Sequence, residues 1–280
     1  RWSVEFWGSN TKESLILGTG LCASGGTRYA PISFGSSVST PTENFTYQVI
    51  PTSGTIKNLY VGLSASPGAG NYTFTLRKGG GNTALTVTIT NPATTGSNTS
   101  NQVSVAAGEY VDMMIAPNGA SASPVAWWGM TFVADTNGES IILGQTSKNA
   151  TPGYIYLTST IFNISWDTTE SNVYQGGQSG ATLKKFYVMI GGTTTGPYTL
   201  YIRASGAGGN TPITVTIPTG QTTGNDTTHT YNMGDYDDLD LSCNPSGTGL
   251  RVYWGLVCYI GTPTVVELSS FTAKGKGNYV

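Results

Sequence analysis

Short runs in which hydrophobic and polar residues alternate recur along the whole chain. The clearest are residues 85–89, Leu-Thr-Val-Thr-Ile, and residues 213–217, Ile-Thr-Val-Thr-Ile. Because successive side chains of a strand point to opposite faces, this pattern predicts strands with one buried and one exposed face. Clusters of Gly, Pro, Asn and Ser separate the runs, and no segment has the 3.6-residue periodicity of an amphipathic helix.

The number and spacing of these runs favour a β-sandwich. In the first half of the chain the predicted strands are residues 15–18, 28–34, 45–50, 56–63, 72–77, 85–89, 103–115 and 125–133. About eight short strands in a unit of this size is typical of a jelly roll, in which two antiparallel sheets pack face to face. The predicted fold class is therefore all-β, with antiparallel, jelly-roll-like sandwiches.

A tryptophan-containing segment occurs three times, which predicts tandem domains. The three copies are residues 1–7, 127–133 and 253–259. Trp2, Trp128 and Trp254 are spaced by 126 residues. In each copy the alternate positions that begin with this tryptophan are similar, so we expect them to form one buried strand face.

The repeat divides the chain into residues 11–134, a first jelly-roll domain, and residues 135–261, a second. A short turn precedes each tryptophan segment, so we expect this strand to pair with the strand before it and to close its own domain. Residues 1–10 and 262–280 then remain as overhangs. They are either parts of further domains in a longer array or strands that add to neighbouring molecules. The candidate assembly residues are Trp2, Val4, Phe6, Val265, Val266 and Leu268.

Composition narrows the function classes. Lys and Arg number 13 and Asp and Glu 15, and charged residues make up 10% of the chain, which is no electrostatic footprint for nucleic acid. No apolar run approaches the roughly 18 residues of a membrane-spanning helix. Three cysteines, an odd number, predict at least one free thiol and no repeated disulfide framework. We expect copies of the chain itself as the partner, with glycans as a further candidate.

Candidate chemistry is sparse. The one histidine, His229, lies in a polar run that we interpret as a solvated loop, and it does not define a catalytic triad or a zinc site. Asp238 and Asp240 share a strand face and could bind calcium; the alternative interpretation is a solvated loop and edge strand. In the repeat, residues 234–241 match residues 108–115 of the first domain. We therefore predict a protein that is not an enzyme, without catalytic, cofactor-binding or metal-binding residues.

Two surface features point outside the cell. Six Asn-x-Ser/Thr sequons are candidate glycosylation sites, namely Asn44, Asn71, Asn98, Asn149, Asn163 and Asn225. The exposed aromatic candidates Trp7, Tyr201 and Tyr259 fit either sugar stacking or contacts between domains and subunits. An extracellular location follows from this interpretation.

The run 54–70, which begins Gly-Thr-Ile-Lys-Asn-Leu-Tyr-Val, resembles a repeat of phage structural proteins. The continuation through residues 72–78, 83–89, 94–96 and 105–112 and the closing tryptophan strand are similar as well. The resemblance implies a structural role in a virion appendage or an extracellular fibre. The predicted function is a subunit that polymerises head to tail; the alternatives are a pair of carbohydrate-binding attachment modules and, less favoured, an accessory part of a secreted enzyme.

Overall fold

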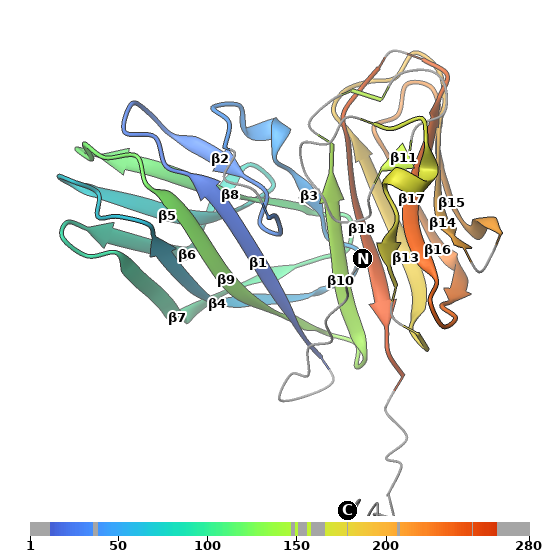
Figure 1. Ribbon diagram of the computed structural model, residues 1–280, viewed down its shortest axis with the longest axis horizontal. Helices are drawn as coiled ribbons and strands as arrows, with labels where there is room; N and C mark the ends of the chain where they lie inside the picture. The colour runs from blue at the N-terminus through green and yellow to red at the C-terminus, as the bar shows by residue number, and fades with distance from the viewer. Residues whose placement is uncertain are drawn as a thin grey trace, which may run out of the picture.

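The computed structural model describes residues 12–35, 39–146, 149–150, 156–157, 166–177, 179–205, 208–247 and 249–261. Within these ranges the chain forms two β-sandwich domains, one after the other (Figure 1). The predicted all-β class and the two tandem antiparallel sandwiches are confirmed. The predicted overhangs, residues 1–10 and 262–280, and with them all six candidate assembly residues, lie outside the described ranges.

The first domain has two antiparallel sheets, with strand orders β1-β9-β4-β7 and β2-β8-β5-β6, and β3 pairs with β8. Its elements are β1 (Glu13–Leu21), β2 (Arg28–Ala30), the 3-10 helix η1 (Glu43–Phe45), β3 (Gln48–Val49), β4 (Gly54–Leu63), β5 (Asn71–Lys78), β6 (Gly81–Thr90), β7 (Thr95–Val105), β8 (Tyr110–Asn118) and β9 (Val125–Ala134).

The second domain repeats this arrangement strand for strand, with orders β10-β18-β13-β16 and β11-β17-β14-β15, and β12 pairs with β17. Its elements are β10 (Glu139–Gln145), β11 (Tyr156–Leu157), the 3-10 helix η2 (Glu170–Asn172), β12 (Gln175–Gly176), β13 (Thr182–Ile190), β14 (Tyr198–Ala204), β15 (Gly209–Ile217), β16 (Thr223–Asn232), β17 (Asp238–Pro245) and β18 (Val252–Tyr259). Most connections cross from one sheet to the other, whereas β5 with β6 and β14 with β15 form hairpins within one sheet.

The repeated tryptophan fills the core between the two sheets. Trp128 is buried, and its indole N–H donates to the carbonyl oxygen of Ile32 at 2.9 Å. The indole lies against Gly18, where a Cβ atom would collide with the ring, and Trp254 lies against Gly144 in the same way. Close packing therefore links this tryptophan to a glycine on the neighbouring first strand, which explains why both recur at the same spacing.

The position of the tryptophan strand differs from the prediction. β9 lies between β1 and β4, and β18 between β10 and β13, whereas the preceding strands β8 and β17 belong to the opposite sheets. The short connection before β9 is thus a crossover between sheets, not a hairpin. Each tryptophan strand still completes its own domain, and its central place, flanked on both sides, explains its apolar sequence.

Candidate assembly interface

The two domains contact each other through an edge and a face. The first edge is the segment 43–52 of the first domain, which includes η1 and β3, together with the adjoining turn 106–109. It packs on the second face, which is the outer face of β10, β18 and β13 in the second domain. Figure 1 shows β3 beside β10 and β18 at the junction of the two domains. By the internal repeat, the first face is the outer face of β1, β9 and β4. The second edge comprises residues 170–177, Ser179 and the turn 234–237.

The first edge approaches the second face at backbone distance. A Cβ atom on Gly255 would collide with the carbonyl oxygen of Val49 and with Pro51, so only glycine fits at this point of β18. Next to it, the Tyr253 hydroxyl donates to the carbonyl oxygen of Asn44. The Arg251 guanidinium lies 3.6 Å from the centre of the Phe45 ring, a cation–π contact across the domain boundary.

A buried carboxylate closes one end of this contact. Glu139 Oε2 accepts a hydrogen bond from the Thr52 hydroxyl at 2.5 Å, and its Oε1 lies 2.9 Å from Lys184 Nζ and 2.7 Å from Lys185 Nζ. Both lysines reach it because Lys185 has a φ of 53° at a β-bulge. Burial alone would raise the pKa of Glu139, but the hydrogen bonds from Lys185, Thr52 and Lys184 outweigh burial and lower the pKa.

The contact buries the second face. Leu143, Tyr253 and Val257 are each at most 2% exposed, and Leu143 packs into the hydrophobic core of the first domain. As a result β18 is buried on both of its faces, where the alternation of its sequence predicted only one. The second face is therefore an interior surface of the molecule, created by the docking of the first edge.

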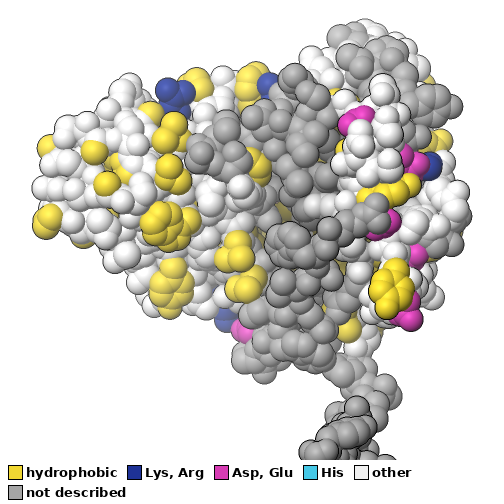
Figure 2. Space-filling model, viewed as in Figure 1, with side chains coloured by type: hydrophobic (Ala, Val, Ile, Leu, Met, Phe, Trp, Pro, Cys, Tyr) yellow, Lys and Arg dark blue, Asp and Glu magenta, His cyan; other side chains and the backbone are white. Residues whose placement is uncertain are grey.

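The first face has the same design but is open. Leu17 and Tyr60 flank Gly129 as Leu143 and Tyr187 flank Gly255. Figure 2 shows hydrophobic side chains gathered on this side of the first domain, over β1, β9 and β4. The exposed fractions are Leu15 46%, Leu17 60%, Leu21 41%, Tyr60 57% and Trp127 49%. At Gly129 a Cβ atom would meet nothing nearer than the Leu17 side chain at 3.6 Å, so the fold of this domain does not require glycine there.

The second edge has the backbone of the first but different side chains. The Gly177 N–H donates to the Asp237 carbonyl oxygen at 2.8 Å, as the Ile50 N–H donates to Glu109 at 2.8 Å. Val49 and Ile50 of the first edge are replaced by Gly176 and Gly177. A tyrosine, Tyr236, projects from the turn of the second edge and is 96% exposed.

The same charged cluster fixes both edges to their sheets. Arg77 Nε lies 2.6 Å from Glu43 Oε1 of η1, and Arg203 Nε lies 2.6 Å from Glu170 Oε1 of η2. Each arginine is paired in register with a buried aspartate, Arg77 with Asp112 and Arg203 with Asp240. This register corrects the sequence match, which placed Asp238 rather than Asp240 opposite Asp112; the repeat is shifted by two residues from β15 to β17, because the turn between β14 and β15 is two residues longer than the turn between β5 and β6.

The buried aspartates are perturbed in the same direction. Desolvation, followed by the negative charge of Glu43, raises the pKa of Asp112 to about 8. Desolvation and Glu170 likewise raise the pKa of Asp240, although Arg203 Nε lies 3.9 Å from its carboxylate. Asp240, one of the two calcium candidates, is thus held in an arginine–carboxylate cluster. Among the described residues no group of three or more His, Cys, Asp or Glu could hold a metal ion.

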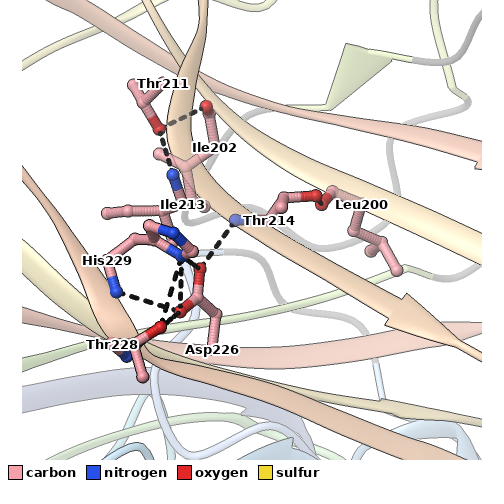
Figure 3. A network of polar contacts seen from close by, with 8 residues as sticks. All are labelled: Leu200, Ile202, Thr211, Ile213, Thr214, Asp226, Thr228 and His229. Carbon is pink, nitrogen blue, oxygen red and sulfur yellow. Dashed lines mark hydrogen bonds and ion pairs between the residues drawn. The ribbon is translucent and has the colours of Figure 1, made fainter.

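The histidine serves a local role in the sheet. His229 lies in β16, not in a loop, and its ring Nδ1 lies 2.9 Å from Asp226 Oδ2. The Asp226 carboxylate also accepts hydrogen bonds from the backbone N–H groups of Thr214, Thr228 and His229, as Figure 3 shows. Burial of Asp226 opposes ionisation, but these donors outweigh it and lower the pKa to about 2. The network joins β15 to β16 around an ionised carboxylate.

The remaining sequence candidates do not gather at one place. Lys184 Nζ lies 4.1 Å from the centre of the Tyr259 ring, Tyr201 is half-buried on β14, and Trp7 lies outside the described ranges. Of the sequons, Asn44, Asn149 and Asn225 are exposed, Asn71 and Asn98 are half-buried, and Asn163 is not described. The cysteines Cys22, Cys243 and Cys258 are free thiols. No helix in the described part of the chain is long and apolar enough to cross a membrane.

Comparisons with known proteins add little to this geometry. No protein-family model matches the chain, and no curated protein matches it. A xanthan lyase from Paenibacillus is similar in structure over 77% of this chain at 14% sequence identity, with a TM-score of 0.22. The chain spans 22% of the length of that lyase. A likeness this weak carries no conclusion about function, so the candidate site is defined by the edges and faces described above.

Proposed function

We propose that this protein is a non-enzymatic structural subunit that assembles head to tail with copies of itself into a filament, in an extracellular fibre or a phage appendage. The observation that carries the proposal is the open first face. It retains the leucine, glycine and tyrosine of a face that, in the second domain, is covered by another domain of the same kind. A docking face without a domain on it in the single chain fits a subunit.

The energetics favour coverage of this face. Full burial of one leucine side chain is worth roughly 1.5–3 kcal/mol, and Leu15, Leu17 and Leu21 lie together on β1 with Trp127 beside them. Contiguous apolar patches of this kind are rare on monomeric proteins and mark interaction sites. Since these side chains are about half exposed, covering them would gain part of that free energy and favour association.

The arrangement also favours an open assembly. The first face belongs to the first domain and the second edge to the second domain, so a contact between them joins two different surfaces and is heterologous. Heterologous contacts generate filaments unless the rotation closes a ring. Strand addition through residues 1–10 and 262–280 stays a prediction alongside this face-to-edge contact.

The proposal is tested with a charge placed on the first face. Leu17→Glu puts a carboxylate in the middle of the patch, and we expect association to weaken roughly 100-fold, about 2.7 kcal/mol. Sedimentation velocity across a concentration series and electron microscopy provide the measurement. Thr88→Glu, exposed on β6 of the opposite sheet, is the matched control and should assemble like the parent. A parent protein that stays dispersed as single particles at high concentration would refute the proposal.

The carbohydrate-binding alternative stays a prediction, for which Tyr60 and Trp127 of the first face are the exposed aromatic candidates. A glycan array separates the two functions: a flat response across sugars removes the alternative, whereas selective binding that survives Leu17→Glu would support it.

A further inference from the structure

The edge-and-face geometry identifies what covers the first face. We infer that the second edge of another copy docks there, with its Tyr236 against Tyr60 of the first face, in a repetition of the contact between the two domains of one chain. This inference rests on the proposed function and deepens it, because it names the docking partner and the residues that meet.

The pairing follows from equivalent positions. In the contact within the chain, the turn of the first edge brings Gly108 against Tyr187 of the second face, where a Cβ atom on Gly108 would lie 3.7 Å from the tyrosine ring. Tyr60 is the counterpart of Tyr187, since both pair in register with the central glycine of the tryptophan strand. Tyr236 is the counterpart of Gly108, because the shift of two residues before β17 aligns the two turns. Repeating the contact therefore places Tyr236 beside Tyr60.

Tyr236 is unexplained by the fold of its own domain. Its φ of 64° lies in the left-handed region, which is uncommon for a bulky residue, and Gly108 adopts a φ of 87° at the equivalent place. With 96% of its surface exposed, the ring gains nothing from packing within the chain. Exposed aromatic side chains are enriched at protein interfaces, where they become anchors when buried. A strained, fully exposed tyrosine at the docking position is accounted for by a partner.

The aromatic residues of the contact also have counterparts. Tyr47 of the first edge lies beside Tyr253 of the second face, with ring centres 6.0 Å apart. The second edge has a tyrosine at the same place, Tyr174, and the first face has Trp127 where the second face has Tyr253. The glycine Gly129 leaves room for a backbone to approach, as Gly255 does within the chain.

The second edge is also held ready for docking. The Arg203–Glu170 ion pair fixes η2 to its sheet as Arg77–Glu43 fixes η1, although within the described ranges only the first edge docks on another domain. Pre-organisation of a contact segment lowers the entropic cost of binding. The second edge therefore has the same ion pair that holds the first edge in its docked conformation.

The test uses cysteines at the two tyrosines. Tyr60→Cys and Tyr236→Cys are placed at exposed sites; the native thiols Cys22 and Cys243 are buried, and Cys258, which is half-buried, is replaced by serine in the parent and in every variant. We expect the double variant, treated with the shortest bismaleimide, to give a ladder of covalent multimers on a denaturing gel. A mixture of the two single variants should give dimers and nothing larger, and each single variant alone should stay monomeric on the gel.

The outcomes separate this inference from the proposed function. If the parent and the variants assemble by sedimentation but no cross-link forms, the occupant is wrong and head-to-tail assembly by another edge stands. If the parent does not assemble at all, both the proposed function and this inference are refuted. A Tyr236→Gly variant, which restores the residue of the first domain, gives a second measurement: association should weaken at least tenfold, and an unchanged affinity would overturn the anchor role of Tyr236.

Discussion

The outer faces of the two tryptophan-bearing sheets carry nearly the same residues in opposite environments. Leu17 on the first face is 60% exposed, whereas its counterpart Leu143 on the second face is 2% exposed. The strands, their registers and the central glycines agree, so the difference arises from the first domain, which packs against the second face. Burial in this molecule is thus a property of the contact between domains rather than of the strand sequence alone.

The two edges, in contrast, share a backbone conformation but carry different side chains. The first edge brings the Val49 carbonyl group and the Tyr47 ring against the second face, while the second edge has glycines at 176 and 177 and carries Tyr236 on the adjoining turn. One edge is specialised for a contact within the chain and the other, we propose, for a contact between chains. Each of the following substitutions is paired with its counterpart in the other domain, so that the chain supplies its own control.

The largest effect is expected at the central glycines. Gly255→Val places a side chain where the Val49 carbonyl oxygen lies, so the first edge must leave the second face. The loss of that buried surface should lower the free energy of unfolding by roughly 4 kcal/mol. Gly129→Val meets only the Leu17 side chain and should leave the stability of the monomer nearly unchanged while it weakens assembly. Chemical denaturation and small-angle scattering measure both; equal destabilisation by the two variants would contradict the distinction between the faces.

A smaller effect is expected at the carboxylates that begin the first strand of each domain. Glu139→Gln removes the buried partner of Lys184 and Lys185 and should cost roughly 3 kcal/mol at neutral pH. The pKa of Glu139 is lowered in the folded protein. The stability that the ionised carboxylate contributes is therefore present above the ordinary pKa of a glutamate and is lost as the pH falls through the lowered pKa.

The counterpart Glu13→Gln, at the end of the open face, is the control for this pair and should change monomer stability by less than about 1 kcal/mol. Urea denaturation at pH 7 and at pH 3 measures the difference. A Glu139→Gln variant with the same stability as the parent at pH 7 would show that the carboxylate does not hold the domains together.

Much of this architecture could be predicted from the sequence, and the failures have physical causes. Strand alternation and the repeat predicted the two sandwiches and the buried side of the tryptophan strands, because a two-residue period reports the core directly. β7 and β16 were missed, since these edge strands are rich in Thr, Ser and Asn and largely exposed, so little hydrophobic alternation marks them. The pairing of β9 with β1 and β4 was missed because a short connection suits a hairpin and a crossover alike.

The candidate site could be predicted only in part. The sequence indicated assembly and aromatic contacts, but it placed them in terminal strands and in Trp7, Tyr201 and Tyr259. Leu17 and Leu143 read alike in the sequence, and nothing local to either strand shows which one another domain covers. The signal that could have found the site was the glycine in the middle of each tryptophan strand, Gly129 and Gly255, which weakens a strand unless a backbone approaches it.

The smallest effect concerns the buried aspartates that accompany each edge. Asp112 receives a hydrogen bond from the Thr46 hydroxyl at 3.5 Å, whereas the residue equivalent to Thr46 in the second domain is Val173. Because burial raises the pKa of both aspartates, the folded state holds more protons than the unfolded state between about pH 4 and pH 8, so stability falls as the pH rises through that window.

Asp240→Asn removes this ionisation, and we expect it to raise the free energy of unfolding by roughly 1–2 kcal/mol at pH 9 relative to the parent, with little change at pH 5. Asp112→Asn should raise the free energy of unfolding less, because the substitution also removes the carboxylate that accepts the hydrogen bond of the Thr46 hydroxyl. Thermal unfolding of both variants across the pH range makes the measurement. Since Asp240 lies under the second edge, assembly of the parent should also weaken above pH 8 while Asp240→Asn assembles unchanged; a parallel loss in both would place the pH dependence elsewhere in the contact.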